Sequence, residues 1–183
     1  MGTNDLGSDI EGVEIWWGFR AKLPSTADGI NARSITFSQF KQIQKRNKKD
    51  CHPGMYWRMN YEGGSSLYAV TDGFDKKHNK TKLPRQLSKN WSTFKIGTYF
   101  SSSNDGWLKA YRNGKLIYEY DGRTVFDEFP NCKPNRRMQT YLRIGVYRGS
   151  PAGWKNKKSD TLHFDDFIIS NEKTDVEKFL VQS

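Results

Sequence analysis

Apolar and polar residues alternate along most of the chain, so the dominant period is two rather than 3.6. This period places successive side chains on opposite faces of a β-strand. The segments with this pattern, all predicted to be strands, are 13–23, 33–44, 55–61, 66–70, 93–101, 107–112, 115–120, 141–148 and 161–170. Clusters of Gly, Asn, Asp, Ser and Pro separate them, as is typical of turns.

Two local signals complete the predicted architecture. Asn113-Gly114 lies between two predicted strands and favours a two-residue hairpin turn. Thr174 followed by Glu177 forms a capping box, which predicts a short C-terminal helix. Many strands with almost no helix indicate an all-β fold, a β-jelly roll in which two antiparallel sheets form a concanavalin-like sandwich. The length of 183 residues and the lack of a linker predict a single domain over residues 1–183.

The charge of the chain narrows the classes of partner. It has 30 Lys and Arg against 20 Asp and Glu, a formal net charge of +10. Such a balance indicates a polyanion: nucleic acid, an acidic polysaccharide or an acidic membrane surface. No apolar run approaches the ~20 residues that span a bilayer, and no nucleic-acid-binding motif is present. The basic clusters at 45–49, 76–85 and 155–158 are either solvated loops or a rim that captures a polyanion.

Candidate metal and disulfide residues are few. Cys51 and Cys132 each lie in a loop-like stretch and form either a disulfide or two free thiols. The three histidines are too scattered to suggest a zinc site. Asp165 and Asp166 either bind a structural calcium together with loop carbonyls or have simple turn and edge roles.

The segment 141–148 carries the most information about function. Tyr141, Arg143 and Tyr147 fall on one face of the predicted strand, and Gly145 leaves a gap between the last two. The residues expected on the core face are Leu142, Ile144 and Val146. A face built from Tyr, Arg and Gly is either ordinary exposed sheet or the floor of a groove for a polar ligand.

Three other predicted strands present similar faces, which mix aromatic rings with amides or cations. These faces comprise Gln39 with Lys41; Tyr56 with Arg58 and Asn60; and Trp107 with Lys109 and Tyr111. In 33–44 the inward face stays ambiguous, because Ile35 and Phe37 are in phase with Lys41. Such faces suit a sugar-acid polymer, since sugar rings stack on aromatics and carboxylates bind Arg, Lys or Gln.

Several motifs follow one another in a recognisable order. They are Glu14-Ile15-Trp16-Trp17-Gly18-Phe19, Gln39-Phe40-Lys41, Asp105-Gly106-Trp107, Asn113-Gly114-Lys115, Tyr141-Leu142-Arg143-Ile144-Gly145-Val146-Tyr147-Arg148 and Leu162-His163-Phe164-Asp165-Asp166. In this order they resemble the jelly-roll polysaccharide lyases, a group that includes heparinase-I-like, glucuronan and alginate lyases. The resemblance runs from about Gly12 to Ser170. Its most specific part is the strand with Arg143, Gly145 and Tyr147, which is similar to the lyase pattern of an aromatic, a Lys or Arg, a Gly and a catalytic Tyr.

The chain departs from the family pattern at two places. Lys41 stands where the Gln-x-His element of the family has its histidine. The Arg-x-Glu strand that is usual before the Trp-Gly-Phe segment is missing or degenerate near residues 5–11. Residues 1–11 are therefore expected to be poorly ordered or to form a remnant edge strand.

The resemblance implies β-elimination in a uronate-containing polysaccharide such as glucuronan or alginate. A base removes the proton beside the carboxylate, which must be neutralised first, and an acid then protonates the leaving glycosidic oxygen. Tyr147 is the candidate acid and a candidate for both proton roles, with Lys41 as the alternative base. The expected neutralising residues are Gln39, Arg58 and Asn60; the expected substrate-binding residues are Arg143, Tyr141, Tyr56, Trp107, Lys109 and Tyr111.

The resemblance also implies the setting in which the protein acts. Catalysis is expected to need no cofactor, and the expected partner is an acidic polysaccharide rather than a specific nucleic acid or a membrane. Secretion follows from this substrate class and not from a signal sequence, and a monomer is expected. The alternative function is a non-catalytic carbohydrate-binding jelly roll that keeps the groove without the chemistry.

Overall fold

The computed structural model describes residues 12–22, 34–44, 57–62, 66–72, 78–84, 89–124, 138–148 and 161–182. The strands are β1 (Glu14–Lys22), β2 (Ser34–Gln44), β3 (Trp57–Glu62), β4 (Ser66–Asp72), β5 (His78–Lys82), β6 (Ser92–Tyr99), β7 (Trp107–Arg112), β8 (Lys115–Asp121), β9 (Met138–Arg148) and β10 (His163–Ser170). One helix, α1 (Lys173–Gln182), follows the last strand. Several predicted features lie outside the described residues: 1–11, Cys51, Cys132, Tyr56 and the basic clusters at 45–49 and 155–158.

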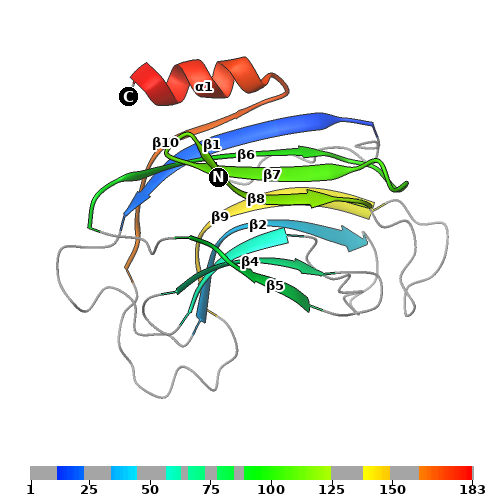
Figure 1. Cartoon of the computed structure of the whole chain (residues 1–183), viewed down its shortest axis with the longest axis horizontal. Coiled ribbons are helices and arrows are strands. Elements are labelled where there is room, and N and C mark those ends of the chain that lie inside the picture. The colour runs from blue at the N-terminus through cyan, green and yellow to red at the C-terminus, as the bar shows by residue number, and fades with distance from the viewer. Residues whose placement is uncertain are drawn as a thin grey trace.

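The strands form two five-stranded antiparallel sheets, stacked as the two layers of a sandwich (Figure 1). Sheet I has the order β10-β1-β6-β7-β8, and sheet II has the order β5-β4-β3-β2-β9. Helix α1 lies on the outer face of sheet I, where it contacts β10, β1 and β6 (Figure 1). The predicted two-sheet antiparallel sandwich with a short C-terminal helix is therefore confirmed.

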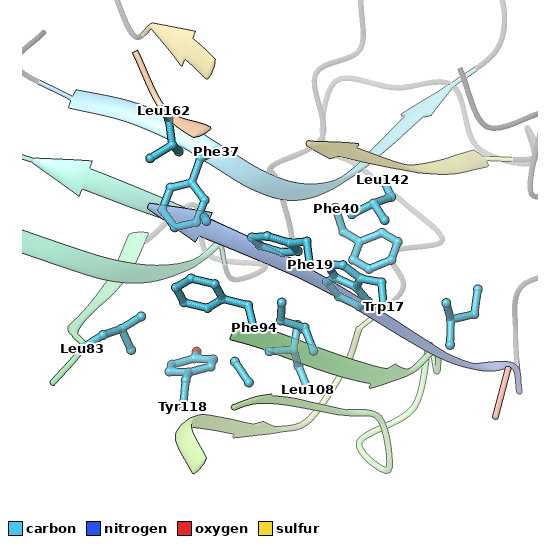
Figure 2. Close-up of a cluster of buried hydrophobic side chains, with 14 of the residues drawn as sticks. Trp17, Phe19, Phe37, Phe40, Leu83, Phe94, Leu108, Tyr118, Leu142 and Leu162 are labelled. Atoms are coloured by element: carbon cyan, nitrogen blue, oxygen red, sulfur yellow. The ribbon is translucent and has the colours of Figure 1, made fainter. Parts of the chain in front are cut away.

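Aromatic side chains from both sheets fill the space between them (Figure 2). Trp17 and Phe19 project from β1 of sheet I, and Phe37 and Phe40 project from β2 of sheet II. The ring centroids of Trp17 and Phe40 are 4.5 Å apart in an edge-on arrangement, and those of Phe19 and Phe37 are 6.4 Å apart. Edge-to-face aromatic contacts of this kind stabilise a core beyond the burial of their area. These rings fix the position of β2 relative to sheet I.

The sequence pattern missed one strand, β5. Its sequence His-Asn-Lys-Thr-Lys has no apolar residue and therefore no apolar alternation. In sheet II, β5 pairs with β4 at the edge, where lysines discourage the pairing of a further strand. Lys80 and Lys82 consequently belong to an edge strand and not to a loop, as their charge cluster had suggested.

The predicted hairpin turn is present between β7 and β8. Asn113 has φ 48° and Gly114 has φ 76°, as a type I′ turn requires. The side-chain oxygen of Asn113 also accepts a hydrogen bond from the backbone N–H of Thr93 at 2.9 Å. This contact ties the turn to the neighbouring strand β6.

The C-terminal helix begins differently from the prediction. It starts at Lys173, so the predicted cap Thr174 lies inside its first turn. The hydroxyl of Ser170 accepts a hydrogen bond from the Glu172 N–H at 3.0 Å and donates one to the Asp175 carboxylate at 2.9 Å. These contacts, rather than a Thr174 capping box, organise the entry into the helix. Within the described ranges no helix is long and apolar enough to cross a membrane.

Candidate active site

Two consecutive residues of β2 face the core. Phe37 is 1% exposed and its ring packs near Phe19 of sheet I. The hydroxyl of the next residue, Ser38, accepts a hydrogen bond from the indole N–H of Trp17 at 3.4 Å. Regular alternation would send neighbouring residues to opposite faces, so β2 contains a bulge at this point.

The bulge decides which residues of β2 face outward. The pairing with β3 passes from Thr36↔Asn60 directly to Ser38↔Met59, so β2 has one extra residue. The alternation restarts beyond the bulge, and Phe40 is in the core with 1% exposure. Gln39 and Lys41 therefore fall on the outer face of sheet II. The ambiguity left by the sequence is resolved, because Lys41 is not on the core face with Ile35.

A first row of polar residues crosses the outer face of sheet II. Gln39 on β2 lies directly opposite Arg58 on β3 and Arg143 on β9. Gln39 is 3% exposed, and Arg143 is exposed. Adjacent strands are ~4.8 Å apart, so the backbones of the two arginines are about 10 Å apart. An amide between two guanidinium-bearing residues is an arrangement that binds carboxylates.

A second row contains the candidate proton-transfer residue. Thr36 lies opposite Asn60 on β3 and Tyr147 on β9. Asn60 is two residues from Arg58 along β3, so the two rows are about 7 Å apart there. The structure thus places three expected neutralising residues and Tyr147 in neighbouring rows of one sheet.

Lys41 lies farther from Tyr147 than the other candidates. Its partner on β9 is Tyr141, whereas the partner of Tyr147 is Thr36. Thr36 and Lys41 are separated by five residues, about 16 Å along a regular strand. Lys41 and Tyr147 therefore share neighbouring strands and one face, but the row of Gln39 lies between them.

The core face of β9 follows the prediction only in part. Leu142 is buried, and Ile144 is half-buried against the core. Val146 is 39% exposed, so its prediction as a core residue was wrong. It follows Gly145 in a stretch where β9 has one residue more than β2, which disturbs the regular contact with the core.

Trp107, Lys109 and Tyr111 lie on the other side of the molecule. They belong to β7 of sheet I, and the intervening Leu108 and Ala110 face the core. The three residues therefore occupy the outer face of sheet I, and the whole core separates them from Gln39. The expectation that they line one groove with the residues of β2, β3 and β9 was wrong, because alternation within a strand does not specify the sheet to which the strand belongs.

These three side chains have partners on sheet I and α1. The Trp107 ring lies 5.6 Å from that of Trp16, and Lys95 lies over the Tyr111 ring at 4.6 Å. Lys109 forms a 2.8 Å ion pair with Glu119, and this hydrogen bond raises the pKa of Lys109. These contacts join the three side chains to neighbouring strands of sheet I, which is a structural role.

The two aspartates considered for calcium also have protein partners. A carboxylate oxygen of Asp166 lies 3.0 Å from the Arg20 guanidinium, and the Asp166 N–H donates to Asp165 at 2.9 Å. Asp166 has φ 51°, which marks an irregularity within β10. Among the described residues, no group of three or more His, Cys, Asp or Glu is arranged to hold a metal ion.

Charge is distributed unequally between the two layers. The strands of sheet II carry basic residues in excess: Lys41, Arg58, Lys80, Lys82, Arg143 and Arg148 against Glu62 and Asp72. The strands of sheet I are closer to neutral, with six basic residues against five acidic ones. Several basic groups of sheet I and α1 pair with carboxylates: Arg20 with Asp166, Lys95 and Lys173 with Glu177, and Lys109 with Glu119. An anionic polymer is accordingly attracted to sheet II more than to sheet I.

Known proteins share this architecture. The structure is similar to an endo-β-1,4-glucuronan lyase from the fungus Trichoderma reesei, with a TM-score of 0.58, 18% identity, and coverage of 91% of this chain and 71% of that one. It is also similar to the alginate lyase Aly36B, with a TM-score of 0.60, 14% identity, and coverage of 90% and 71%. For an alginate lyase from Pseudomonas aeruginosa the TM-score is 0.56, with 11% identity and coverage of 89% and 67%. The fold is thus the jelly roll of these enzymes, as predicted.

The sequence itself also matches a family. No curated protein matches it. Residues 5–168, however, match the family model described as polysaccharide lyase, and this range is most of the 183-residue chain. The resemblance inferred from the sequence motifs is confirmed, and the chain belongs to the polysaccharide lyase family.

Proposed function

We propose that the protein cleaves a uronate-containing polysaccharide, such as glucuronan or alginate, by β-elimination on the outer face of sheet II. The observation that carries this proposal is the row in which Gln39 lies between Arg58 and Arg143. The row of Tyr147 runs beside it. The excess of basic residues on the strands of sheet II supports an acidic polymer as the substrate.

The first row is suited to neutralising the substrate carboxylate. Gln39 and Arg58, with Asn60 in the next row, supply amide and guanidinium donors for the carboxylate beside the carbon that loses its proton. These hydrogen bonds stabilise the enolate-like charge that develops in the transition state. Arg143, on the other side of Gln39, binds the carboxylate of a neighbouring sugar.

Tyr147 carries the proton transfers in this proposal. Its phenolate takes the proton beside the carboxylate, and the electron pair of that C–H bond forms the new C=C bond. The C–O bond to the leaving sugar breaks, and its oxygen takes the proton from the phenol. Lys41 is the less favoured base, because the row of Gln39 lies between it and Tyr147, so the two residues are poorly placed to act on the same sugar.

Two further expectations remain part of the proposal. Tyr141, opposite Lys41 in the register of β9 and β2, forms a subsite for a sugar ring. Tyr56, which lies outside the described residues, stays an expected subsite residue. In this proposal the substrate is an extracellular polymer, so the enzyme acts outside the cell. It is also proposed to act as a monomer and without a cofactor.

A direct assay tests the proposal. The protein is incubated with glucuronan, alginate and heparin, and the ultraviolet absorbance of the unsaturated product is followed. Wild type is expected to produce absorbance with at least one polymer, and Tyr147→Phe to abolish it. Tyr111→Phe is the matched control, because it removes a hydroxyl from the opposite side of the sandwich. Binding of a polymer without product would contradict the elimination and favour a non-catalytic carbohydrate-binding protein.

A further inference from the structure

Strand β9 has its own bulge, opposite that of β2. Pairing with β2 passes from Ser38↔Ile144 to Thr36↔Tyr147, so the four residues 144–147 of β9 face the three residues 36–38. Gly145 lies inside this stretch with φ 140°. Only glycine adopts such a φ without strain. The bulge therefore depends on the absence of a side chain at this position.

The bulge determines the face on which Tyr147 lies. If regular pairing continued from Ser38↔Ile144, Tyr147 would be opposite Ile35. Ile35 is fully buried in the core between the sheets, and paired residues share a face. The extra residue moves Tyr147 into register with Thr36, on the outer face.

We propose that Gly145 is a positioning residue, whose bulge brings Tyr147 to the face and the row in which it acts beside Gln39 and Arg143. The chemical role of Tyr147 in this inference rests on the proposed function. The position of Tyr147 rests only on the register of β9 and β2. Among the described residues, apart from its own chain neighbours, none has an atom within 4 Å of the position that a Cβ of Gly145 would occupy. A substitution therefore acts through the backbone conformation and not through a steric clash.

A matched pair of variants separates positioning from general strain. Gly114 in the β7–β8 turn also has a positive φ, 76°, and open space where a Cβ would lie. Gly145→Ala and Gly114→Ala thus both introduce backbone strain without a clash, on different sheets. Both are expected to lower the melting temperature. Only Gly145→Ala is expected to lower kcat, by about tenfold or more with little change in KM, since displacing a reacting group costs rate.

The outcomes distinguish a failure of this inference from a failure of the proposed function. The inference is overturned if Gly145→Ala keeps kcat within about twofold of wild type. It is also overturned if Gly114→Ala lowers kcat as much as Gly145→Ala does. If Gly145→Ala does not fold at the assay temperature, wild type and both variants are compared at a lower temperature at which all three are folded, as shown by their melting curves. If wild type cleaves none of the three polymers, the proposed function fails, and polymer affinity is measured by calorimetry instead. Weaker binding of the Gly145 variant than of Gly114→Ala then supports the placement, and equal binding overturns it.

Discussion

Arg143 on β9 stands directly opposite Gln39 on β2, and Arg58 stands opposite Gln39 on its other side. A buried amide between two arginine positions is poorly matched to a neutral ligand and well matched to a carboxylate. The register of three strands, rather than a local motif, creates this arrangement.

Replacing Gln39 by Glu should remove activity while largely preserving the fold. The new carboxylate would occupy nearly the same volume, but it would compete with the substrate for Arg58 and Arg143. Losing the amide donor and repelling the substrate carboxylate should lower kcat/KM by about a hundredfold or more, which corresponds to ~3 kcal/mol. Steady-state kinetics checks this, with the melting temperature as the control for folding. Activity close to that of wild type would exclude Gln39 from the site.

Added salt should weaken substrate binding because it screens the attraction between the anionic polymer and the basic residues of sheet II. Basic residues of sheet I should not contribute to this effect. Arg58→Gln should raise KM at low ionic strength and reduce the increase of KM with salt, because one screened attraction is lost. Lys109→Gln should change neither KM nor its dependence on salt, since Lys109 lies on the outer face of sheet I and pairs with Glu119. KM measured over a series of NaCl concentrations distinguishes the two variants. An equal response of both would contradict the assignment of the polymer to sheet II.

Phe37 should be among the most important core residues for stability. It is 1% exposed and packs against Phe19 and Phe94 of the other sheet. Phe37→Ala should lower the free energy of unfolding by about 3–5 kcal/mol. Leu116→Ala is the control, because Leu116 is 47% exposed and should change it by less than about 0.5 kcal/mol. Denaturant unfolding followed by tryptophan fluorescence measures both.

The docking of α1 should depend on acid pH through Glu177. Its hydrogen bond with Lys95 lowers the pKa of Glu177, so the folded state favours the carboxylate. The resulting stability is present above the ordinary Glu pKa and is lost as pH falls through the lowered pKa of the folded state. Wild type should exceed Glu177→Gln in stability by up to about 1 kcal/mol at neutral pH, because the pair is partly exposed. Melting curves at neutral and acid pH should show this difference shrinking in acid; a difference independent of pH would contradict it.

Period-two alternation was enough to predict nearly all of the strands. It was not enough for β5, because an edge strand of polar residues needs no apolar face. It also could not assign strands to sheets, and for that reason Trp107, Lys109 and Tyr111 were grouped with residues on the opposite side. Pairing of distant strands depends on the whole fold and leaves no local periodicity.

The faces of β2 were ambiguous for a different reason. Ile35 and Phe37 are in one phase and Phe40 is in the other, yet all three are buried. Such a change of phase between large apolar residues is itself a sequence signal of a bulge, as is an isolated glycine such as Gly145 inside a strand. Interpreted in this way, the sequence would have placed Gln39 and Lys41 outward.

The position of α1 has a practical consequence for handling the enzyme. The helix rests on sheet I, and Val181 near its end is 86% exposed. Replacing Val181 by a residue with a reactive side chain would allow the protein to be attached to a solid support with sheet II turned toward the solution. Long polysaccharide chains could then reach sheet II of the immobilised protein. Attachment through the lysines of β5 would instead hold sheet II against the support.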